Sequence, residues 1–114
     1  MKKIILITSL FLIYSSHTLS YEPKLQKIIG DLDSPWSLSF INNNKAIITE
    51  KAGNLILVDL VNKKIKKIKH NLNILEDGQG GLLEVLYYED QVFVSYSENL
   101  KKGNSSTSVA SAKF

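Results

Sequence analysis

Between residues 36 and 68 the sequence consists of short apolar segments separated by turn residues, and this pattern restricts the fold more than any other feature. Residues 36–40 (Trp-Ser-Leu-Ser-Phe) alternate apolar and polar side chains with period two, as in a strand with one buried face. Further strands are expected at residues 45–50, 55–60 and 65–68, with turns at 42–44, 52–54 and 61–63. No stretch after residue 20 shows a helical period, so the sequence predicts an all-β chain that begins with a four-stranded antiparallel unit.

The same pattern restarts after residue 81. Strands are expected at residues 82–88, 91–97 and 107–114. Meanders of four short strands, repeating at about 45 residues, are typical of β-propeller blades, and a small sandwich is the weaker alternative. The chain therefore reads as about one and a half blades, which would leave apolar flanks in water if they stood alone. We expect either the N-terminal part of a longer protein or a short chain that assembles with others to complete the ring.

Individual segments carry further expectations. The apolar run at residues 55–60 indicates a strand buried on both faces, and the lysines of residues 65–68 suit an outer edge strand. Trp36 is expected to pack between sheets. Residues 21–25 are an alternative strand for another sheet.

The N-terminus is typical of a secretory signal peptide. Lys2 and Lys3 precede an apolar run at residues 4–14, and small or polar residues follow up to Ser20. The apolar run is too short for a membrane span, which needs roughly twenty residues, so a retained anchor is the lesser alternative. We expect residues 1–20 to be removed, leaving a secreted, periplasmic chain of residues 21–114 that is not held in a membrane.

Charge and cysteine content exclude several classes of function. The chain has a formal net charge of +3, but two of its fourteen lysines lie in the predicted signal peptide. The basic run at residues 63–69 is interrupted by Ile65 and Ile68, and no arginine is present for bidentate base or phosphate contacts. A solvated strand is expected there, with no nucleic-acid partner. The absence of cysteine excludes disulfides, so the fold rests on its apolar core or on partners.

Residues 76–81 (Glu-Asp-Gly-Gln-Gly-Gly) place three glycines around a single amide side chain. Such a loop is either a turn that needs positive φ at two or three positions or a ligand contact. The loop is a poor match to a phosphate-binding loop, because no Lys, Ser/Thr and helix follow the glycines. The glycine-rich loop lies between two predicted strand units and would therefore connect two blades. Loops of this kind often carry function on a rigid scaffold.

Four segments, in order, resemble the glucose/sorbosone dehydrogenase family, the exported aldose sugar dehydrogenases that use pyrroloquinoline quinone (PQQ). They are residues 32–40, 48–55, 77–85 and 94–97. Each motif is weak alone, but together and at the family's spacing they are fairly specific. Two departures fall in predicted surface turns: residues 42–44 (Asn-Asn-Asn) replace a Pro-Asp-Gly turn, and Lys51 replaces the usual Arg.

The resemblance implies a longer, six-bladed propeller that oxidises an aldose sugar at C1 by hydride transfer to PQQ, with calcium as a second cofactor. Gln79 would then lie beside both cofactor and substrate, where an amide offers donors and an acceptor without a charge. Gly80 is implied as a second cofactor contact and Asp77 as a weaker substrate contact. In the alternative reading, Gln79 and the glycines serve only the geometry of the turn.

The general base of the family, a His on a later blade, has no counterpart in this chain. His17 lies in the predicted signal peptide, and His70 is expected at an exposed strand end. No catalytic residue is therefore assigned, and these residues alone are expected to be inactive. No metal ligands are assigned either, since Glu76, Asp77 and Glu84 lack the spacing of a calcium loop. A non-enzymatic exported propeller that binds a ligand or partner, or a truncated remnant without function, remains an alternative.

Overall fold

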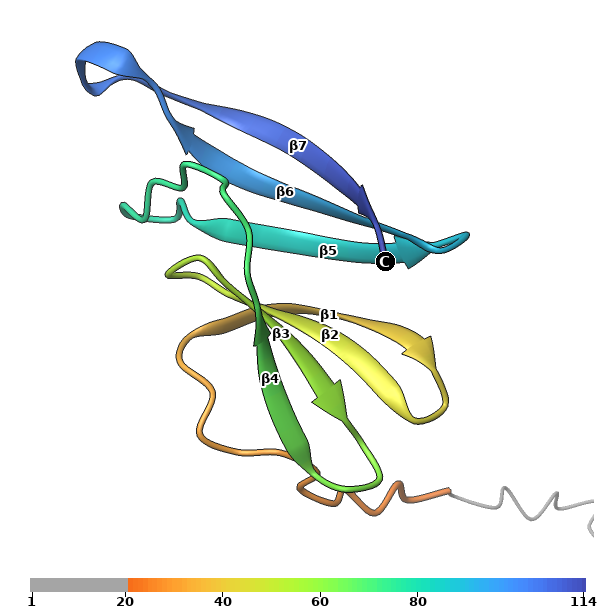
Figure 1. The fold of residues 1–114 in the computed structure, drawn as a ribbon. Helices are drawn as coiled ribbons and strands as arrows, with labels where there is room; N and C mark the ends of the chain where they lie inside the picture. The colour runs from red at the N-terminus through yellow and green to blue at the C-terminus, as the bar shows by residue number, and fades with distance from the viewer. Residues whose placement is uncertain (1–20) are drawn as a thin grey trace, which may run out of the picture.

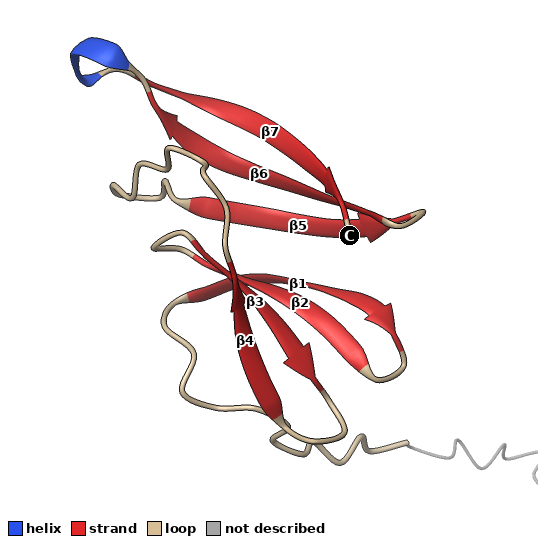
Figure 2. Ribbon diagram, in the orientation of Figure 1, coloured by secondary structure: helices blue, strands red, loops and turns tan. Residues whose placement is uncertain are grey.

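The computed structural model describes residues 21–114, and the predicted signal peptide, with His17, lies outside the described residues. The described chain is built of strands joined by short turns (Figure 1). In chain order they are β1 (Pro35–Asn42), β2 (Lys45–Glu50), β3 (Asn54–Asp59), β4 (Lys64–Ile68), β5 (Leu82–Tyr88), β6 (Gln91–Asn99) and β7 (Ser105–Lys113). A short 3-10 helix, η1 (Lys101–Gly103), lies between β6 and β7 (Figure 2). The all-β prediction is confirmed.

The strands form two antiparallel sheets, each a meander in sequence order. The first has the order β1-β2-β3-β4 and the second β5-β6-β7. The two sheets lie face to face, with β5 next to β1 and β2 (Figure 1). The predicted strand positions differ from the observed ones by no more than about two residues, the usual uncertainty of element ends. The chain therefore forms a four-stranded sheet, and the same strand pattern begins again in the second sheet.

The main core lies between the two sheets. Ile47 of β2 is fully buried against the second sheet, where Leu82 and Val85 come from β5. The other buried members of this cluster belong to β6: Val92, Val94 and Tyr96. Removing such side chains from water stabilises the packing by roughly 25 cal/mol per Å² of apolar surface.

A second, smaller cluster lies on the outer face of the first sheet. Ile56 and Val58 of β3 are buried there, while Leu55 and Leu57 of the same strand pack against the main core. The predicted burial of this strand on both faces is thus confirmed. Ile29 and Leu32, from the segment before β1, cover part of the outer cluster. Residues 21–25 form no strand.

The prediction that Trp36 packs between sheets is wrong. Trp36 is 46% exposed, and Phe40 of the same strand is 63% exposed. Strand β1 does alternate with period two, but its serines face the second sheet, so Leu38 and Phe40 lie on the outer face. Only Ile41, next to a register shift at the end of the strand, packs against the main core. Hydrophobicity alone assigns the wrong face here, because the serines are needed for hydrogen bonds.

Those hydrogen bonds join the first sheet to the free edge of β5. Ser37 Oγ accepts a hydrogen bond from the Val85 N–H (3.3 Å), and Ser39 Oγ accepts one from the Tyr87 N–H (2.9 Å). Thr49, fully buried, donates its hydroxyl to the carbonyl oxygen of Leu83 (2.5 Å). Since unpaired backbone groups at a sheet edge are costly to bury, these contacts fix the position of the second sheet on the first.

Candidate functional site

The glycine-rich loop lies where the chain crosses from the first sheet to the second. Before the loop, residues 73–75 run antiparallel to the end of β6, with an isolated bridge between Ile74 and Glu98. The Leu75 N–H donates to the carbonyl oxygen of Ser97 (2.8 Å), and the Asn99 N–H donates to that of Asn73 (2.9 Å). The crossing segment is therefore tied to the second sheet before the glycines begin.

A tight turn follows at residues 77–80. The Gly80 N–H donates to the carbonyl oxygen of Asp77 (2.7 Å), and Gly78 has a φ of 54° at the first central position. Positive φ at that position only is the pattern of a type II′ turn, which favours glycine there. Gly81 is the second glycine of the loop with positive φ, at 151°. The prediction of positive φ at two or three positions is confirmed.

The chain itself fills the space beside the last two glycines. A Cβ on Gly81 would overlap the carbonyl oxygen of Lys51, and that oxygen also accepts a hydrogen bond from the Leu82 N–H (3.0 Å). A Cβ on Gly80 would lie 2.8 Å from Ser97 Oγ. Both glycines are thus required by packing, whatever binds the loop. A contact between Gly80 and the cofactor stays a prediction.

Lys51, in the turn between β2 and β3, holds this loop from the first sheet. Its ammonium group donates to the carbonyl oxygen of Gly78. Its backbone N–H donates to the carbonyl oxygen of Ser34 (3.0 Å), just before β1. Glu50, 3% exposed, completes the turn by accepting hydrogen bonds from the Asp33 N–H and the Asn54 amide, both at 2.8 Å.

The outer surface of the turn is open, in contrast to its inner side. Asp77, Gly78 and Gln79 are all exposed, and no atom lies within 4 Å of a Cβ placed on Gly78. The Gln79 amide is therefore carried at the tip of a well-supported turn, with donors and an acceptor available for hydroxyl or carbonyl groups. The roles predicted for Gln79 and Asp77 stay predictions, and the structure places both side chains on this exposed tip.

His70 follows β4 and is exposed, as expected. Its Nδ1 accepts a hydrogen bond from the Leu72 N–H (3.3 Å), which leaves Nε2 as the donor to the carbonyl oxygen of Gly53 (2.7 Å). The ring thus connects the crossing segment to the turn between β2 and β3. No sequence pattern indicates this role.

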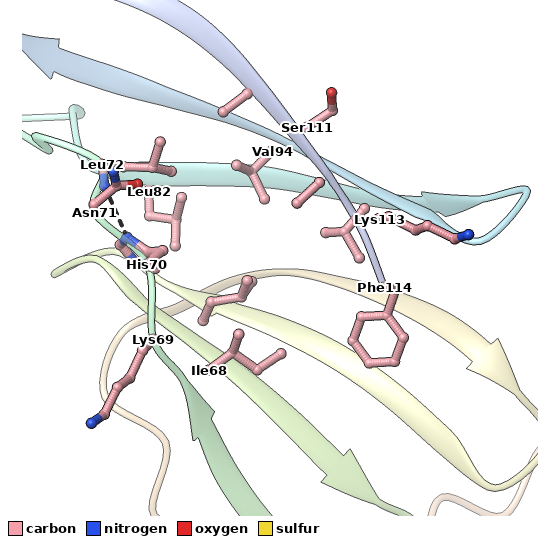
Figure 3. A pocket seen from close by; sticks show the side chains of 14 residues that line it. Ile68, Lys69, His70, Asn71, Leu72, Leu82, Val94, Ser111, Lys113 and Phe114 are labelled. Atoms are coloured by element: carbon pink, nitrogen blue, oxygen red, sulfur yellow. Dashed lines mark hydrogen bonds between the residues drawn. The ribbon is translucent and has the colours of Figure 1, made fainter.

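A cavity of about 200 Å³ lies between the sheets, away from the glycine turn. Its walls are mainly apolar and include Leu82 and Val94, while His70 and Phe114 lie at its two ends (Figure 3). No sequence pattern predicted this cavity. A possible signal was the small side chains Ala110 and Ala112 at alternate positions of β7, both of which line the cavity.

Two structural criteria for other kinds of site are not met in the described part of the chain. Within residues 21–114, no three His, Cys, Asp or Glu side chains are grouped so that they could hold a metal ion. No helix in the same range is long and apolar enough to cross a membrane.

Comparison with known proteins gives consistent matches. A family model described as Glucose / Sorbosone dehydrogenase matches residues 32–114. The crystal structure of a glucose dehydrogenase is 31% identical, with a TM-score of 0.73, and the match covers 80% of this chain and 28% of that one. The soluble aldose sugar dehydrogenase of Escherichia coli, in its apo-form, is 29% identical with a TM-score of 0.65, covering 72% and 25% of the two chains.

A more distant structure shares the fold. The PQQ-bound aldose sugar dehydrogenase of Streptomyces coelicolor is 15% identical with a TM-score of 0.66, and the match covers 76% of this chain and 26% of that one. No curated protein gives a significant match. The chain spans little more than a quarter of the length of the solved structures it matches.

Proposed function

Because residues 32–114 match its family model, this chain belongs to the glucose/sorbosone dehydrogenase family, and we propose that it is the N-terminal part of an exported, PQQ-dependent aldose dehydrogenase. The solved relatives are β-propeller sugar dehydrogenases, and the antiparallel sheets of this chain follow the same fold. An aldose sugar is the proposed substrate, since two of these relatives are a glucose dehydrogenase and an aldose sugar dehydrogenase.

The observation that carries the proposal is the exposed Gln79 on a turn that both sheets support. Asp77 and Gln79 point away from the core, while the glycines beside them are fixed by contacts to Lys51 and Ser97. A rigid support with an open polar tip suits ligand binding, because little conformational freedom is lost when the ligand binds. The same loop is one of the segments that resemble the family.

When bound, PQQ would supply the hydride acceptor for oxidation of the sugar at C1. Gln79 binds and orients: its amide N–H groups donate to a carbonyl or hydroxyl oxygen, and its carbonyl oxygen accepts from a sugar hydroxyl. Because the amide is uncharged, it fixes a geometry without adding a charge next to the reacting carbon. Asp77, beside it, is proposed as a weaker contact to sugar hydroxyls.

The general base is proposed to lie outside these residues. Both nitrogens of His70 are used in contacts to Leu72 and Gly53. Residues 21–114 alone are therefore proposed to be inactive. Calcium is also part of the proposal, with its ligands supplied by the rest of the protein.

We propose that the protein is exported, because residues 1–20 have a basic start, an apolar run and small residues before Tyr21. N-terminal sequencing of the protein from a periplasmic fraction tests this directly. A mature N-terminus within two residues of Tyr21 is expected, and an N-terminus at Met1 would contradict it.

The function is tested in the protein extended through the codons that follow residue 114, reconstituted with PQQ and calcium. We expect PQQ-dependent aldose oxidation, and we expect Gln79→Ala to lower kcat/KM by about tenfold or more, the effect of losing a hydrogen bond in a water-poor site. The matched control is Gln91→Ala, an exposed glutamine at the opposite end of the sheets. Undiminished activity in Gln79→Ala would remove Gln79 from the site, and no PQQ-dependent oxidation of any aldose would refute the proposed function.

A further inference from the structure

We propose that Lys51 is a positioning residue for Gln79, and that it acts by fixing one peptide group of the glycine turn. This inference rests on the proposed function, since it concerns how the side chain proposed to bind the ligand is held. Lys51 belongs to the first sheet, whereas the turn leads into the second, so the site would depend on a contact between the two.

Two hydrogen bonds and one packing contact join Lys51 to the loop. Its ammonium group donates to the carbonyl oxygen of Gly78, and its own carbonyl oxygen accepts from the Leu82 N–H (3.0 Å). The same carbonyl oxygen lies against Gly81, where a Cβ would overlap it. The ammonium group therefore holds the tip of the loop, and the carbonyl group holds its base.

The carbonyl group of Gly78 is part of the peptide unit that also contains the Gln79 N–H. In a four-residue turn from Asp77 to Gly80, this is the central peptide. Its rotation by about half a turn would convert the type II′ turn into type I′, which requires positive φ at the second central position, here Gln79. Non-glycine residues seldom adopt that conformation. The Lys51 ammonium group binds the central peptide in its observed orientation and opposes the rotation further.

A charge is useful at this place because the turn is exposed. Water competes with an ordinary hydrogen bond at Gly78, while a hydrogen bond from an ionised donor is stronger than one between neutral groups. The backbone of Lys51 is fixed in turn by its N–H bond to Ser34 (3.0 Å). The side chain of Lys51 therefore extends from a fixed backbone. Its hydrogen bond to Gly78 in turn sets the orientation of the neighbouring Gln79.

The test compares three variants: Lys51→Met, which keeps the apolar stem and loses the donors; Lys51→Arg, which keeps a charged donor; and Lys67→Met. Lys67 is the matched control, because its ammonium group also bonds one oxygen, Asn54 Oδ1 (3.2 Å), but lies on the edge strand β4. Hydrogen exchange of the Gly80 and Leu82 amides, measured by NMR on the full chain, reports on the turn without any ligand. Steady-state kinetics of the PQQ-loaded protein, with kcat and KM determined separately, report on the proposed binding site at Gln79.

We expect Lys51→Met to speed exchange of the Gly80 amide about fivefold and to lower kcat/KM by a similar factor, as loss of one partly exposed charged hydrogen bond predicts. Lys51→Arg should restore both values, and Lys67→Met should change neither. Unchanged Gly80 exchange in Lys51→Met, or an arginine variant that behaves like the methionine variant, would overturn the inference. Faster exchange in a protein that oxidises no aldose would support the role of Lys51 in the turn and refute the proposed function instead.

Discussion

The connections at the two ends of the sheets are stabilised in different ways. At the end that carries Gln79, they are tied to one another: Lys51 contacts Gly78 and Gly81, and residues 73–75 pair with the end of β6. At the opposite end the side-chain hydrogen bonds of each turn stay within that turn. Single backbone hydrogen bonds link these turns to other segments, from the Leu60 N–H to the Asn44 carbonyl oxygen (2.8 Å) and from the Phe114 N–H to the Asp90 carbonyl oxygen (2.9 Å). The Asn44 N–H donates to Asn42 Oδ1 (2.8 Å), and Tyr87 donates its hydroxyl to Asp90 Oδ1 (2.8 Å).

The turn after β3 is a further example of local side-chain hydrogen bonds at this end. Asp59 accepts hydrogen bonds from the Val61 N–H (3.0 Å) and from both the backbone and side chain of Asn62 (2.8 and 2.9 Å). A substitution of these side chains leaves the backbone link from Leu60 to Asn44 in place, so its effect is expected to stay mainly within its own turn. The Gln79 end is different, because a change in one connection is transmitted to its neighbours, as a preorganised binding surface requires.

The largest expected effect comes from Gly81→Ala. The methyl group would overlap the Lys51 carbonyl oxygen, and φ is 151°. We expect a loss of about 3 kcal/mol or more in the free energy of unfolding, from backbone strain together with the displaced turn. Urea unfolding measures it. Gly78→Ala is the control in the same turn: its φ of 54° is also positive, but its Cβ would meet no atom within 4 Å, so a smaller loss of about 1–2 kcal/mol is expected from backbone strain alone. Equal losses in the two variants would show that the contact with Lys51 is not important.

A smaller effect is expected from Thr49→Val, which removes one hydroxyl that links the sheets. Thr49 is fully buried, and its Oγ1 bonds to the Leu83 carbonyl oxygen and to the Ser37 N–H (3.1 Å). Two partly buried backbone groups would lose their partner, so we expect a loss of about 2 kcal/mol in the free energy of unfolding. Thr107→Val, on an exposed part of β7, should leave the unfolding midpoint unchanged. A neutral Thr49→Val would contradict the role given to the hydroxyls between β1, β2 and β5.

The smallest expected effect is at the end opposite Gln79 and appears only in acid. The hydrogen bond from the Asn62 N–H, followed by that from the Asn62 side chain, holds the pKa of Asp59 below its ordinary value. The folded state therefore binds the proton less readily than the unfolded state. The resulting stability is present above the ordinary pKa of an aspartate and is lost as the pH falls through the folded pKa.

Unfolding midpoints measured from neutral pH down through this range test the effect. Asp59→Asn should remove that part of the acid dependence, and Asn62→Ala should reduce it, while PQQ-dependent activity stays unchanged in both. An activity loss in either variant would show that the two ends are coupled.

Local features of the fold were predictable from the sequence. The strands at residues 82–88 and the turn at Glu89-Asp90 follow from period-two alternation and turn composition, and both residues of that turn have positive φ, at 47° and 59°. The glycines at 78 and 81 were likewise predictable as positions of positive φ. In each case the signal and its structural cause lie within a few residues of each other.

Contacts between distant segments were not predictable. The approach of the Lys51 carbonyl to Gly81 joins the turn of one sheet to the start of the next. Glu50 reads as an ordinary charge at a strand end, yet it is buried and accepts hydrogen bonds from Asp33 and Asn54. The exposed Trp36 was assigned to the wrong face because hydroxyl bonding to β5, which no local pattern reveals, outweighs the apolar alternation. Such contacts decide how Gln79 is held.

The central claim is that the supported turn at residues 77–80 presents Gln79 to the bound cofactor and sugar. The most direct measurement is a crystal structure of the extended protein loaded with PQQ, calcium and an aldose. We expect the Gln79 amide to lie within hydrogen-bonding distance of PQQ or the sugar, with the Lys51 to Gly78 contact unchanged. Ligands bound with Gln79 still exposed to solvent, or a turn whose central peptide has rotated away from Lys51, would contradict it.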